Sequence, residues 1–349
     1  MATATLTIDL DAITQNWRAL DAKSAQSVET AAVIKADAYG LGAAVVAKSL
    51  YHAGVRSFFV AVAEEGIVIR KAVGNNAKIY VFSGMMLTDA QPIREYNLIP
   101  MLNAPNQVAR FRNETSDLTY GLQLDTGMNR LGLEPDEFNG VKDAANDADL
   151  IISHLACADD PAHPQNAQQL AAFHAMTNGL SVRRSLAATG GTLLGADYHF
   201  DLCRPGVGLY GGFPFNDATP TAHLAIPVIQ TRRVTKGETV GYSAAWVAKR
   251  DSIVATLAAG YADGLIRAMG HDSVSLYAGN TPCPLIGRVS MDLLTVDVTD
   301  LDAVPNELHL LNSQQTVDDL ADAAGTIGYE ILTSLGGRYE RRYVGEARG

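Results

Sequence analysis

Short apolar segments alternate with helix-like segments through much of the chain, and this alternation constrains the fold more than any other feature. The apolar segments are rich in β-branched and aromatic residues and lie at residues 30–34, 57–62, 78–82, 97–101, 119–124, 150–153, 183–187 and 198–203. Most are separated by segments, such as 43–52 and 164–178, whose apolar residues recur at intervals of three and four. Strands that alternate with amphipathic helices build parallel βα units, and eight such units predict a closed (β/α)₈ TIM-like barrel.

An open, doubly wound sheet is the alternative that periodicity alone leaves. No Gly-x-Gly-x-x-Gly segment follows the first strand, however, so a dinucleotide site has no support. The alternation stops near residues 220–227. Strand-like runs without long intervening helices follow at 227–234, 252–257, 273–277, 285–289, 293–298 and 307–311, with one helical segment at 316–324. Because 349 residues suffice for two domains, we predict a barrel domain over residues 1–225 and a mainly β domain over residues 226–349.

Composition argues against several classes of partner. The net charge of −11 disfavours nucleic acid and anionic membranes, and the basic residues at 338–342 are interpreted as a solvated face. No apolar segment approaches the roughly 18 residues of a membrane span, and the N-terminus lacks the pattern of a secretory leader. The cysteines are odd in number, widely spaced and without metal-ligand spacing: Cys157, Cys203 and Cys283. We therefore expect a cytoplasmic protein without a bound metal.

Side chains with useful chemistry follow five of the predicted strands. In chain order they are Lys35, Arg130, His154, Thr189 and Arg204. The active site of a (β/α)₈ barrel lies at the carboxyl ends of its strands, so these side chains are expected to converge. A lysine that is desolvated at the end of a buried strand loses its preference for the ammonium form and can act as a nucleophile. Taken singly, each residue is equally compatible with a structural role, such as a core histidine or an arginine paired with a carboxylate.

Two glycine-containing loops follow the seventh and eighth strands, where such barrels usually bind phosphate. Residues 188–191 are Ala-Thr-Gly-Gly, and residues 204–211 are Arg-Pro-Gly-Val-Gly-Leu-Tyr-Gly. A hydroxyl and backbone N–H groups that a ligand can approach closely are suited to an anion. Glycines that serve only to form turns are the alternative for either loop alone.

Residues 35–40, Lys-Ala-Asp-Ala-Tyr-Gly, resemble the lysine segment of the alanine racemase family, whose members depend on pyridoxal 5'-phosphate (PLP). Further segments resemble that family in the same order, at residues 124–132, 204–211, 260–264 and 287–292. The resemblance extends over essentially the whole chain. It implies a PLP-binding barrel, a β-rich second domain, and a homodimer with shared active sites.

The resemblance also implies roles for individual residues. Lys35 bears the cofactor and is one of two catalytic bases, and Tyr261 of the partner subunit is the other. Arg204 faces the pyridine nitrogen, where a guanidinium that keeps its proton makes the ring a weaker electron sink. His154 connects the partner's Tyr261 to Arg204. The other implied contacts are Tyr39, Thr189, Gly206 and Val207 for the phosphate, and Arg130 and the partner's Met291 for the substrate carboxylate.

The activity implied is the interconversion of L- and D-alanine by a two-base mechanism, which supplies D-alanine for peptidoglycan. A racemase of broader specificity, for example for serine, is the nearest alternative, since the sequence does not measure the substrate pocket. A barrel protein that only carries PLP is a second alternative, but such a protein would need neither Tyr261 nor the second domain.

Three positions depart from the family pattern. Gln123 replaces a lysine that becomes carbamylated in many members, and we hypothesise that its amide oxygen accepts a hydrogen bond from Arg130 instead. Leu41 replaces a common histidine, and Gly337 lies about where some members have a phosphate-contacting tyrosine. These differences leave the implied catalytic groups in place and bear on turnover and substrate breadth.

Overall fold

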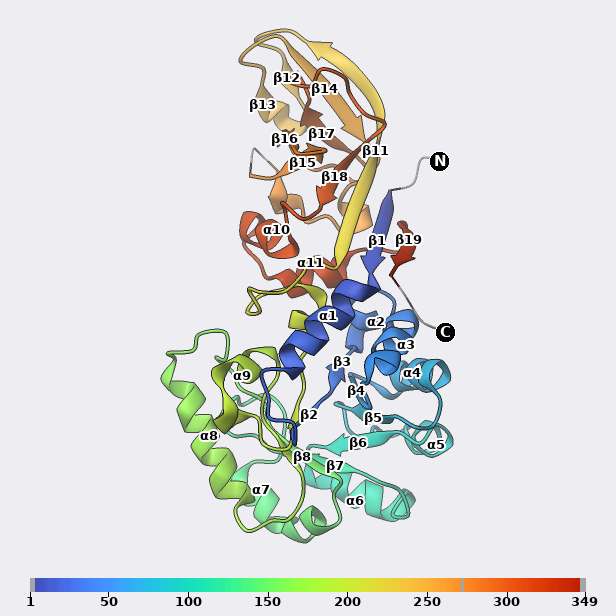
Figure 1. The fold of residues 1–349 in the computed structure, drawn as a ribbon, viewed down its shortest axis with the longest axis vertical. Helices are drawn as coiled ribbons and strands as arrows, with labels where there is room; N and C mark the ends of the chain where they lie inside the picture. The colour runs from blue at the N-terminus through green and yellow to red at the C-terminus, as the bar shows by residue number, and fades with distance from the viewer. Residues whose placement is uncertain (1–3, 271–272, 346–349) are drawn as a thin grey trace. The chain divides into compact units, whose positions relative to one another are not determined.

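The computed structural model describes residues 4–270 and 273–345, and these residues pack into two units (Figure 1). The barrel unit contains residues 13–209 and 213–218. The β-rich unit contains residues 4–12, 210–212, 219–270 and 273–345. Residues 4–12 therefore belong to the β-rich unit, and the chain crosses to the barrel unit within helix α1 (Leu10–Asp21). The domain boundary between residues 225 and 226 stays a prediction.

Parallel strands form the centre of the barrel unit. One sheet has the order β3-β4-β5-β6-β7-β8-β9, and a separate parallel pair joins β10 to β2. Strands β2 and β3 are consecutive parts of the predicted first strand, on either side of Ala31. The bounds are β2 (Glu29–Thr30), β3 (Ala32–Val33), β4 (Ser57–Val60), β5 (Lys78–Val81), β6 (Ile99–Leu102), β7 (Gly121–Gln123), β8 (Leu150–Ile152), β9 (Arg184–Ser185) and β10 (Leu202–Cys203).

Main-chain hydrogen bonds close the ring at β10. On one side the Arg204 N–H donates to the Ala187 carbonyl at 2.8 Å. On the other side the Ala31 N–H donates to the Cys203 carbonyl at 2.9 Å. Strand β10 therefore lies between the last strand of the sheet and the first, which confirms the predicted (β/α)₈ barrel.

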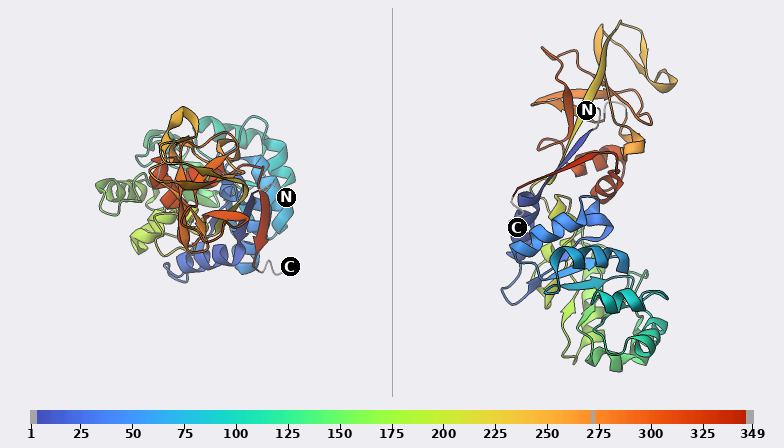
Figure 2. Two further views of the ribbon diagram at one scale, coloured as in Figure 1. Left: turned by 90° about the horizontal axis from the view of Figure 1, so that it is seen from above. Right: turned by 90° about the vertical axis from the view of Figure 1, so that its right-hand side faces the viewer.

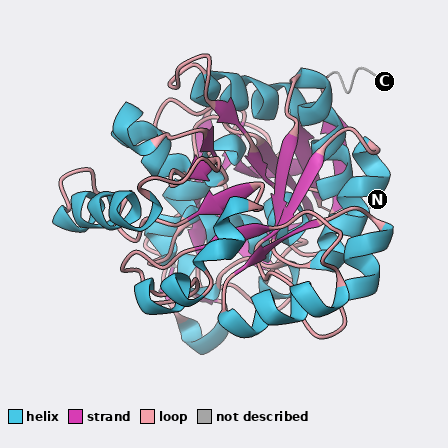
Figure 3. Cartoon of the chain, turned by 90° about the horizontal axis from the view of Figure 1, so that it is seen from below, coloured by secondary structure: helices cyan, strands magenta, loops and turns pink. Residues whose placement is uncertain are grey.

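Helices surround the barrel strands (Figure 3). The buried positions of α3 (Ala43–Ala53) include Ala43, Val46, Ala47 and Leu50, the three- and four-residue spacing from which the helix was predicted. Within the described ranges, every helix is too short or too polar to cross a lipid bilayer. The other helices of this unit are α4 (Ala63–Val73), α5 (Ala90–Glu95), α6 (Pro105–Glu114), α7 (Pro135–Gly140), α8 (Pro164–Thr177) and α9 (Thr189–Leu194), with 3₁₀ turns η1 (Lys142–Asn146), η2 (Ala196–Tyr198) and η3 (Val207–Tyr210). The segment α2 (Lys35–Tyr39) is a left-handed turn rather than a right-handed helix.

The predicted eighth strand, residues 198–203, is too long. Only Leu202 and Cys203 are extended, because Tyr198 ends the 3₁₀ turn η2 and Phe200 has a φ of 52°. A positive φ cannot continue a β-strand. The apolar character of these residues reflects packing instead, since the Phe200 ring lies 5.0 Å from the ring of Phe173.

The barrel interior is filled by side chains. Phe59 on β4 stacks on Tyr80 of β5 at a ring-centroid distance of 4.6 Å and on Phe82 at 5.2 Å. Phe59 and Tyr80 are fully buried. Burying a side chain of this size contributes about 1.5–3 kcal/mol. The interior is therefore a packed core, and ligands are confined to the loops at its end.

Antiparallel strands dominate the β-rich unit, drawn in yellow to red apart from the N-terminal β1 (Figure 2). The sheet order is β14-β17-β16-β15-β18-β11-β1-β19, and an additional β11–β14 pairing closes six of these strands into a ring. The bounds are β1 (Thr5–Asp9), β11 (Ala222–Val234), β12 (Thr239–Val240), β13 (Trp246–Val247), β14 (Ser252–Leu257), β15 (Ser275–Ala278), β16 (Thr281–Ile286), β17 (Leu294–Asp297), β18 (Glu307–Leu311) and β19 (Glu340–Val344), with α10 (Val317–Ala324), α11 (Gly328–Ser334) and 3₁₀ turns η4 (Tyr242–Ala244), η5 (Tyr261–Asp263) and η6 (Arg267–Met269).

The first and last strands of the described residues meet in this unit. Strand β1 pairs antiparallel with β11 and parallel with β19, so residues far apart in sequence lie side by side (Figure 1). The interpretation of residues 338–342 as a solvated face is right for Arg338 and Arg342, which are exposed, and wrong in part, because Tyr339 is buried and Glu340 and Arg341 are only partly exposed. Residues 340–342 also belong to β19, an edge strand, where charged side chains are common.

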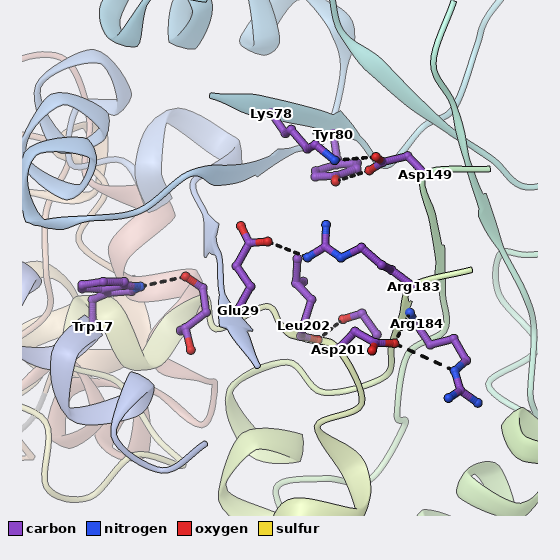
Figure 4. Close-up of polar contacts among 11 residues, drawn as sticks. Trp17, Glu29, Lys78, Tyr80, Asp149, Arg183, Arg184, Asp201 and Leu202 are labelled. Atoms are coloured by element: carbon purple, nitrogen blue, oxygen red, sulfur yellow. Dashed lines mark hydrogen bonds and ion pairs between the residues drawn. The ribbon is translucent and has the colours of Figure 1, made fainter. Parts of the chain in front are cut away.

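Ion pairs and hydrogen bonds join the strands at the amino end of the barrel (Figure 4). Asp149, just before β8, pairs with Lys78 and accepts a hydrogen bond from the Tyr80 hydroxyl at 2.6 Å. Arg183, just before β9, donates to Glu29 of β2 at 2.5 Å. These contacts lie at the end of the barrel opposite to Lys35, where side chains serve stability rather than catalysis.

We expect Asp149→Ala to lower the free energy of unfolding by about 1–3 kcal/mol, because the buried Tyr80 hydroxyl loses its acceptor. Urea denaturation measures this change. Asp143→Ala is the matched control, since its pair with Arg112 is exposed on both sides and should be worth at most about 1 kcal/mol. If Asp149→Ala costs as much in a Tyr80→Phe background as in the wild type, the hydroxyl is not the cause.

Candidate active site

Lys35 directly follows Ile34 at the carboxyl end of the first strand, as predicted. Its ammonium nitrogen lies 5.8 Å from the centroid of the Phe82 ring. Burial lowers the pKa of Lys35, the charge of Arg130 lowers it further, and the carboxylate of Glu65 opposes both effects. Lys35 therefore deprotonates more readily than a surface lysine, which favours nucleophilic attack.

A left-handed turn follows Lys35. Ala36, Asp37, Ala38 and Tyr39 have φ angles of 52°, 54°, 55° and 57°. Each such residue costs roughly 1–2 kcal/mol relative to a right-handed conformation, so neighbouring structure has to stabilise the turn. The turn ends with Tyr39 buried in the interior.

Arg204, which follows β10, is fully buried. Its guanidinium donates hydrogen bonds to the Ser185 hydroxyl and, at 2.6 Å, to the Ser153 carbonyl. Among the described residues, no carboxylate lies within ion-pair distance of it. Burial lowers the pKa of Arg204 to about 10, so the side chain remains a cation at neutral pH. A structural arginine held by a carboxylate, one of the alternatives left by the sequence, is thus not what the structure contains.

The two glycine loops lie against each other. The Thr189 hydroxyl oxygen accepts hydrogen bonds from the Gly206 N–H at 3.0 Å and the Gly208 N–H at 3.3 Å. A Cβ atom at Gly206 would lie 2.4 Å from the Tyr39 hydroxyl oxygen, so only glycine permits this approach. Val207, the next residue, is buried at the start of η3. The structure therefore brings all four residues predicted to bind phosphate together.

His154 follows β8 and lies among three cations. Burial lowers its pKa to about 3, and the charges of Arg204, Arg130 and Lys35 act in the same direction. The imidazole is therefore neutral at neutral pH. Since three cations from different loops act on one imidazole, the carboxyl end of the barrel carries an excess of positive charge suited to an anionic ligand.

Tyr261 and Met291, predicted to act from a partner subunit, lie next to each other in the β-rich unit. The Tyr261 N–H donates to the Ser290 carbonyl at 3.0 Å, and the Ala262 N–H donates to the Met291 carbonyl at 2.9 Å. Both side chains project outward, with exposed fractions of 43% for Tyr261 and 54% for Met291.

Asp263 fixes this segment, and the sequence did not single it out for that role. One oxygen of its buried carboxylate accepts the Gly260 N–H at 2.8 Å, and the other pairs with Arg338 at 3.1 Å. At Gly260, a Cβ would lie 2.3 Å from the Ser290 carbonyl oxygen. Gly260 and Asp263 therefore have structural roles that are separate from the chemistry of Tyr261.

Comparison with known proteins identifies the family. The family model for the N-terminal domain of alanine racemase matches residues 8–214, and that for the C-terminal domain matches residues 221–343. The chain is 60% identical over 347 residues to the alanine racemase of Dinoroseobacter shibae, covering 99% of each chain. It is 59% identical over 345 residues to that of Cereibacter sphaeroides, covering 98% of this chain and 99% of the relative.

The chain belongs to the alanine racemase family. It is therefore an isomerase, as the sequence predicted. Solved alanine racemases have the same fold. The crystal structure from Bartonella henselae with covalently bound pyridoxal phosphate matches with a TM-score of 0.92 at 35% identity, covering 99% of this chain and 100% of that chain. The biosynthetic alanine racemase of Pseudomonas aeruginosa matches with a TM-score of 0.92 at 33% identity and the same coverage.

One hypothesis about the departures from the alanine racemase pattern is wrong. The amide oxygen of Gln123 is buried and accepts no hydrogen bond from the described residues, while its amide nitrogen donates to the Leu131 carbonyl at 3.1 Å. Arg130 is exposed, and the backbone N–H of Arg130 donates a hydrogen bond to the Asp125 carboxylate at 3.2 Å. Gln123 thus holds the main chain of the loop at Leu131 and accepts no hydrogen bond from the Arg130 guanidinium.

The other two departures lie in contrasting environments. Leu41 is fully buried. Its apolar side chain needs no hydrogen-bond partner there, unlike the histidine that it replaces. Gly337 has no atom within 4 Å of the position of a Cβ, so a larger side chain would have space there.

The sequence analysis did not predict a role for two acidic residues near Lys35. Glu65, in the first turn of α4, accepts hydrogen bonds from two backbone N–H groups, and Asp37 accepts the Ala43 N–H at 2.7 Å. Acidic residues are common at helix N-termini, so their positions in the sequence did not separate them from ordinary helix caps.

We expect Gly206→Ala to lower the free energy of unfolding by about 1–3 kcal/mol, because the added methyl overlaps the Tyr39 hydroxyl. In a Tyr39→Phe background the loss should be smaller, since the nearest atom is gone; thermal or urea denaturation of the four proteins measures both. Gly140→Ala is the control, because it has open space and should be neutral or slightly stabilising. Equal losses in both backgrounds would exclude the Tyr39 contact as the cause.

Proposed function

We propose that this protein interconverts L- and D-alanine, using PLP held in the barrel unit. The observation that carries the proposal is the arrangement of Lys35, Arg130 and Arg204 around His154, in a chain of the alanine racemase family. A lysine with a lowered pKa supplies the nucleophilic amine, and the excess of positive charge is complementary to a phosphate and a carboxylate.

The residues present fit PLP. Arg204 is a buried cation whose protein partners are neutral oxygens, so a ring nitrogen is a suitable further acceptor for its N–H groups. Thr189 accepts two backbone N–H groups and keeps its own proton to donate to a phosphate. Lys35 would hold the cofactor, with Tyr39, Gly206 and Val207 beside the phosphate. When bound, PLP withdraws electrons from the amino acid and so acidifies its α-proton.

Two bases would exchange that proton. Lys35 would act on D-alanine and Tyr261 of the partner subunit on L-alanine. A phenol with an ordinary pKa of about 10 is a weak base, so it needs a neighbour that favours the phenolate. The neutral imidazole of His154 would link the partner's Tyr261 to the cation Arg204 and supply that stabilisation.

The substrate would be oriented by its carboxylate. Arg130 is a planar donor suited to binding a carboxylate through two hydrogen bonds, and the backbone N–H of the partner's Met291 would add a third donor. A homodimer with shared sites accounts for the outward-facing Tyr261 and Met291, which are large side chains exposed in a single chain.

The biological role that we propose is the supply of D-alanine for peptidoglycan in the cytoplasm. The three cysteines are free in this structure, which is compatible with a reducing compartment. Serine is the substrate that most directly tests breadth, because it differs from alanine by one hydroxyl.

Borohydride treatment of the holoenzyme should attach PLP irreversibly to the peptide that contains Lys35, because its amine is the one that burial activates. Peptide mass spectrometry measures the site. Lys48, exposed on α3, should remain unmodified. Attachment at another lysine while Lys35 is unmodified would contradict the assignment.

A two-base site should lose racemisation when either base is removed and keep stereospecific chemistry at the other. Tyr261→Phe should reduce racemisation about 10²–10⁴-fold, the usual contribution of a general acid or base. In D₂O, measured by NMR, this variant should still exchange the α-proton of D-alanine much faster than that of L-alanine. The same assay with serine measures substrate breadth.

Mixed subunits test whether the two bases come from different chains. A heterodimer of Lys35→Ala and Tyr261→Phe subunits contains one site with both native bases, so it should regain part of the activity that either variant homodimer lacks. No recovery in verified heterodimers, together with equal loss of exchange for both enantiomers, would reject the shared two-base mechanism.

A further inference from the structure

We propose that Glu65 is a positioning residue, whose carboxylate holds the left-handed turn that carries Lys35. This inference rests on the proposed function, in which Lys35 binds PLP. The Ala36 N–H donates to one Glu65 oxygen at 2.7 Å, and the Ala61 N–H donates to the other at 2.7 Å. One carboxylate therefore joins the loops that follow two neighbouring barrel strands.

The position of these N–H groups explains why a carboxylate is needed. Strands β3 and β4 pair in parallel up to Val33 and Phe59, and the Ile34 N–H still donates to the Phe59 carbonyl at 2.9 Å. Beyond that point the two segments diverge. The segment after β3 enters the left-handed turn, and the segment after β4 leads to α4. Glu65 provides the acceptors that the strand ladder no longer supplies.

The turn is conformationally unfavourable and is held by two carboxylates near its start. Four successive residues without glycine have positive φ angles, which L-amino acids adopt only when the surrounding structure imposes them. Glu65 binds the first residue of the turn, Ala36. Asp37 accepts the Ala43 N–H at 2.7 Å and so joins the turn to the start of α3. Loss of the Glu65 contact would free the end that adjoins Lys35.

Glu65 also balances the charges around Lys35. The charged or titratable groups that act on Lys35 are Arg130, from the loop after β7, and Glu65, from α4, and Lys35 in turn acts on His154, after β8. Glu65 is the acidic member of this set. Its removal should therefore destabilise the ammonium form of Lys35, an effect that a purely mechanical support would not have.

Glu65→Gln is the informative substitution. The side chain keeps its size, but the single amide oxygen can satisfy only one of the two N–H groups, and the amide nitrogen then opposes the other. Glu64→Gln is the matched control, because Glu64 is the preceding residue of the same helix and is exposed, whereas Glu65 is half-buried. Glu65→Asp keeps the charge and shortens the reach.

Two measurements on the full-length chain test the proposal, and neither measures racemisation. Hydrogen exchange of the Ala36 and Ala61 amides should become at least about tenfold faster in Glu65→Gln, because a hydrogen bond is lost. The pH midpoint for acetylation of the Lys35 amine, measured by mass spectrometry without PLP, should fall, because an opposite charge is removed. Glu64→Gln should change neither quantity.

The outcomes separate this proposal from the proposed function. Unchanged exchange at both amides, or an unchanged Lys35 midpoint, in Glu65→Gln would overturn the role of Glu65. If Glu65→Gln fails to fold, Glu65→Asp decides: faster exchange with a retained midpoint supports the role, and unchanged exchange overturns it. If the expected changes occur but borohydride attaches PLP elsewhere in the wild type, the proposed function fails and the structural role of Glu65 stands.

Discussion

Closure of the parallel strands into a ring is the constraint on which the site depends. Strand β10 contributes only Leu202 and Cys203, yet its neighbours accept and donate main-chain hydrogen bonds on both sides. Without that closure the first and last strands would be open edges, and Lys35 and Arg204 would not belong to one rim. Because all the strands are parallel, their carboxyl ends open at the same end of the barrel, and every loop with active chemistry lies there.

The same rim holds energetically unfavourable local structure. Arg204 is buried beside neutral oxygens, His154 lies among cations, and four residues after Lys35 have left-handed backbone. Buried charge without a counter-charge and positive φ angles both oppose folding. An anionic ligand would relieve the first of these costs and stabilise the folded state by mass action. The packed interior and the ion pairs at the opposite end of the barrel supply the stability that such a rim requires.

Local pattern predicted the elements whose burial is periodic and missed those whose position depends on distant partners. Helix α3 followed from its apolar spacing, but strand β19 was missed, because Arg341 and Arg342 form an edge strand beside β1 and bury little. The predicted strand over residues 198–203 failed for the opposite reason, since its apolar side chains pack from a turn at Phe200. Gln123 was expected to accept a hydrogen bond from Arg130, but its amide donates to the Leu131 carbonyl, and Asp125 accepts a hydrogen bond from the Arg130 N–H.

The sequence by itself determined which chemical groups meet, because in a barrel of parallel strands a residue that directly follows a strand must lie at the carboxyl end. The placement of Lys35, Arg130, His154, Thr189 and Arg204 followed from that rule and from the family resemblance. Only the tertiary structure decided how these groups are held. Glu65 bridges two loops, Ser153 and Ser185 hold Arg204, and a left-handed turn carries Lys35, because hydrogen-bond partners and unfavourable backbone angles are chosen by residues distant in the chain.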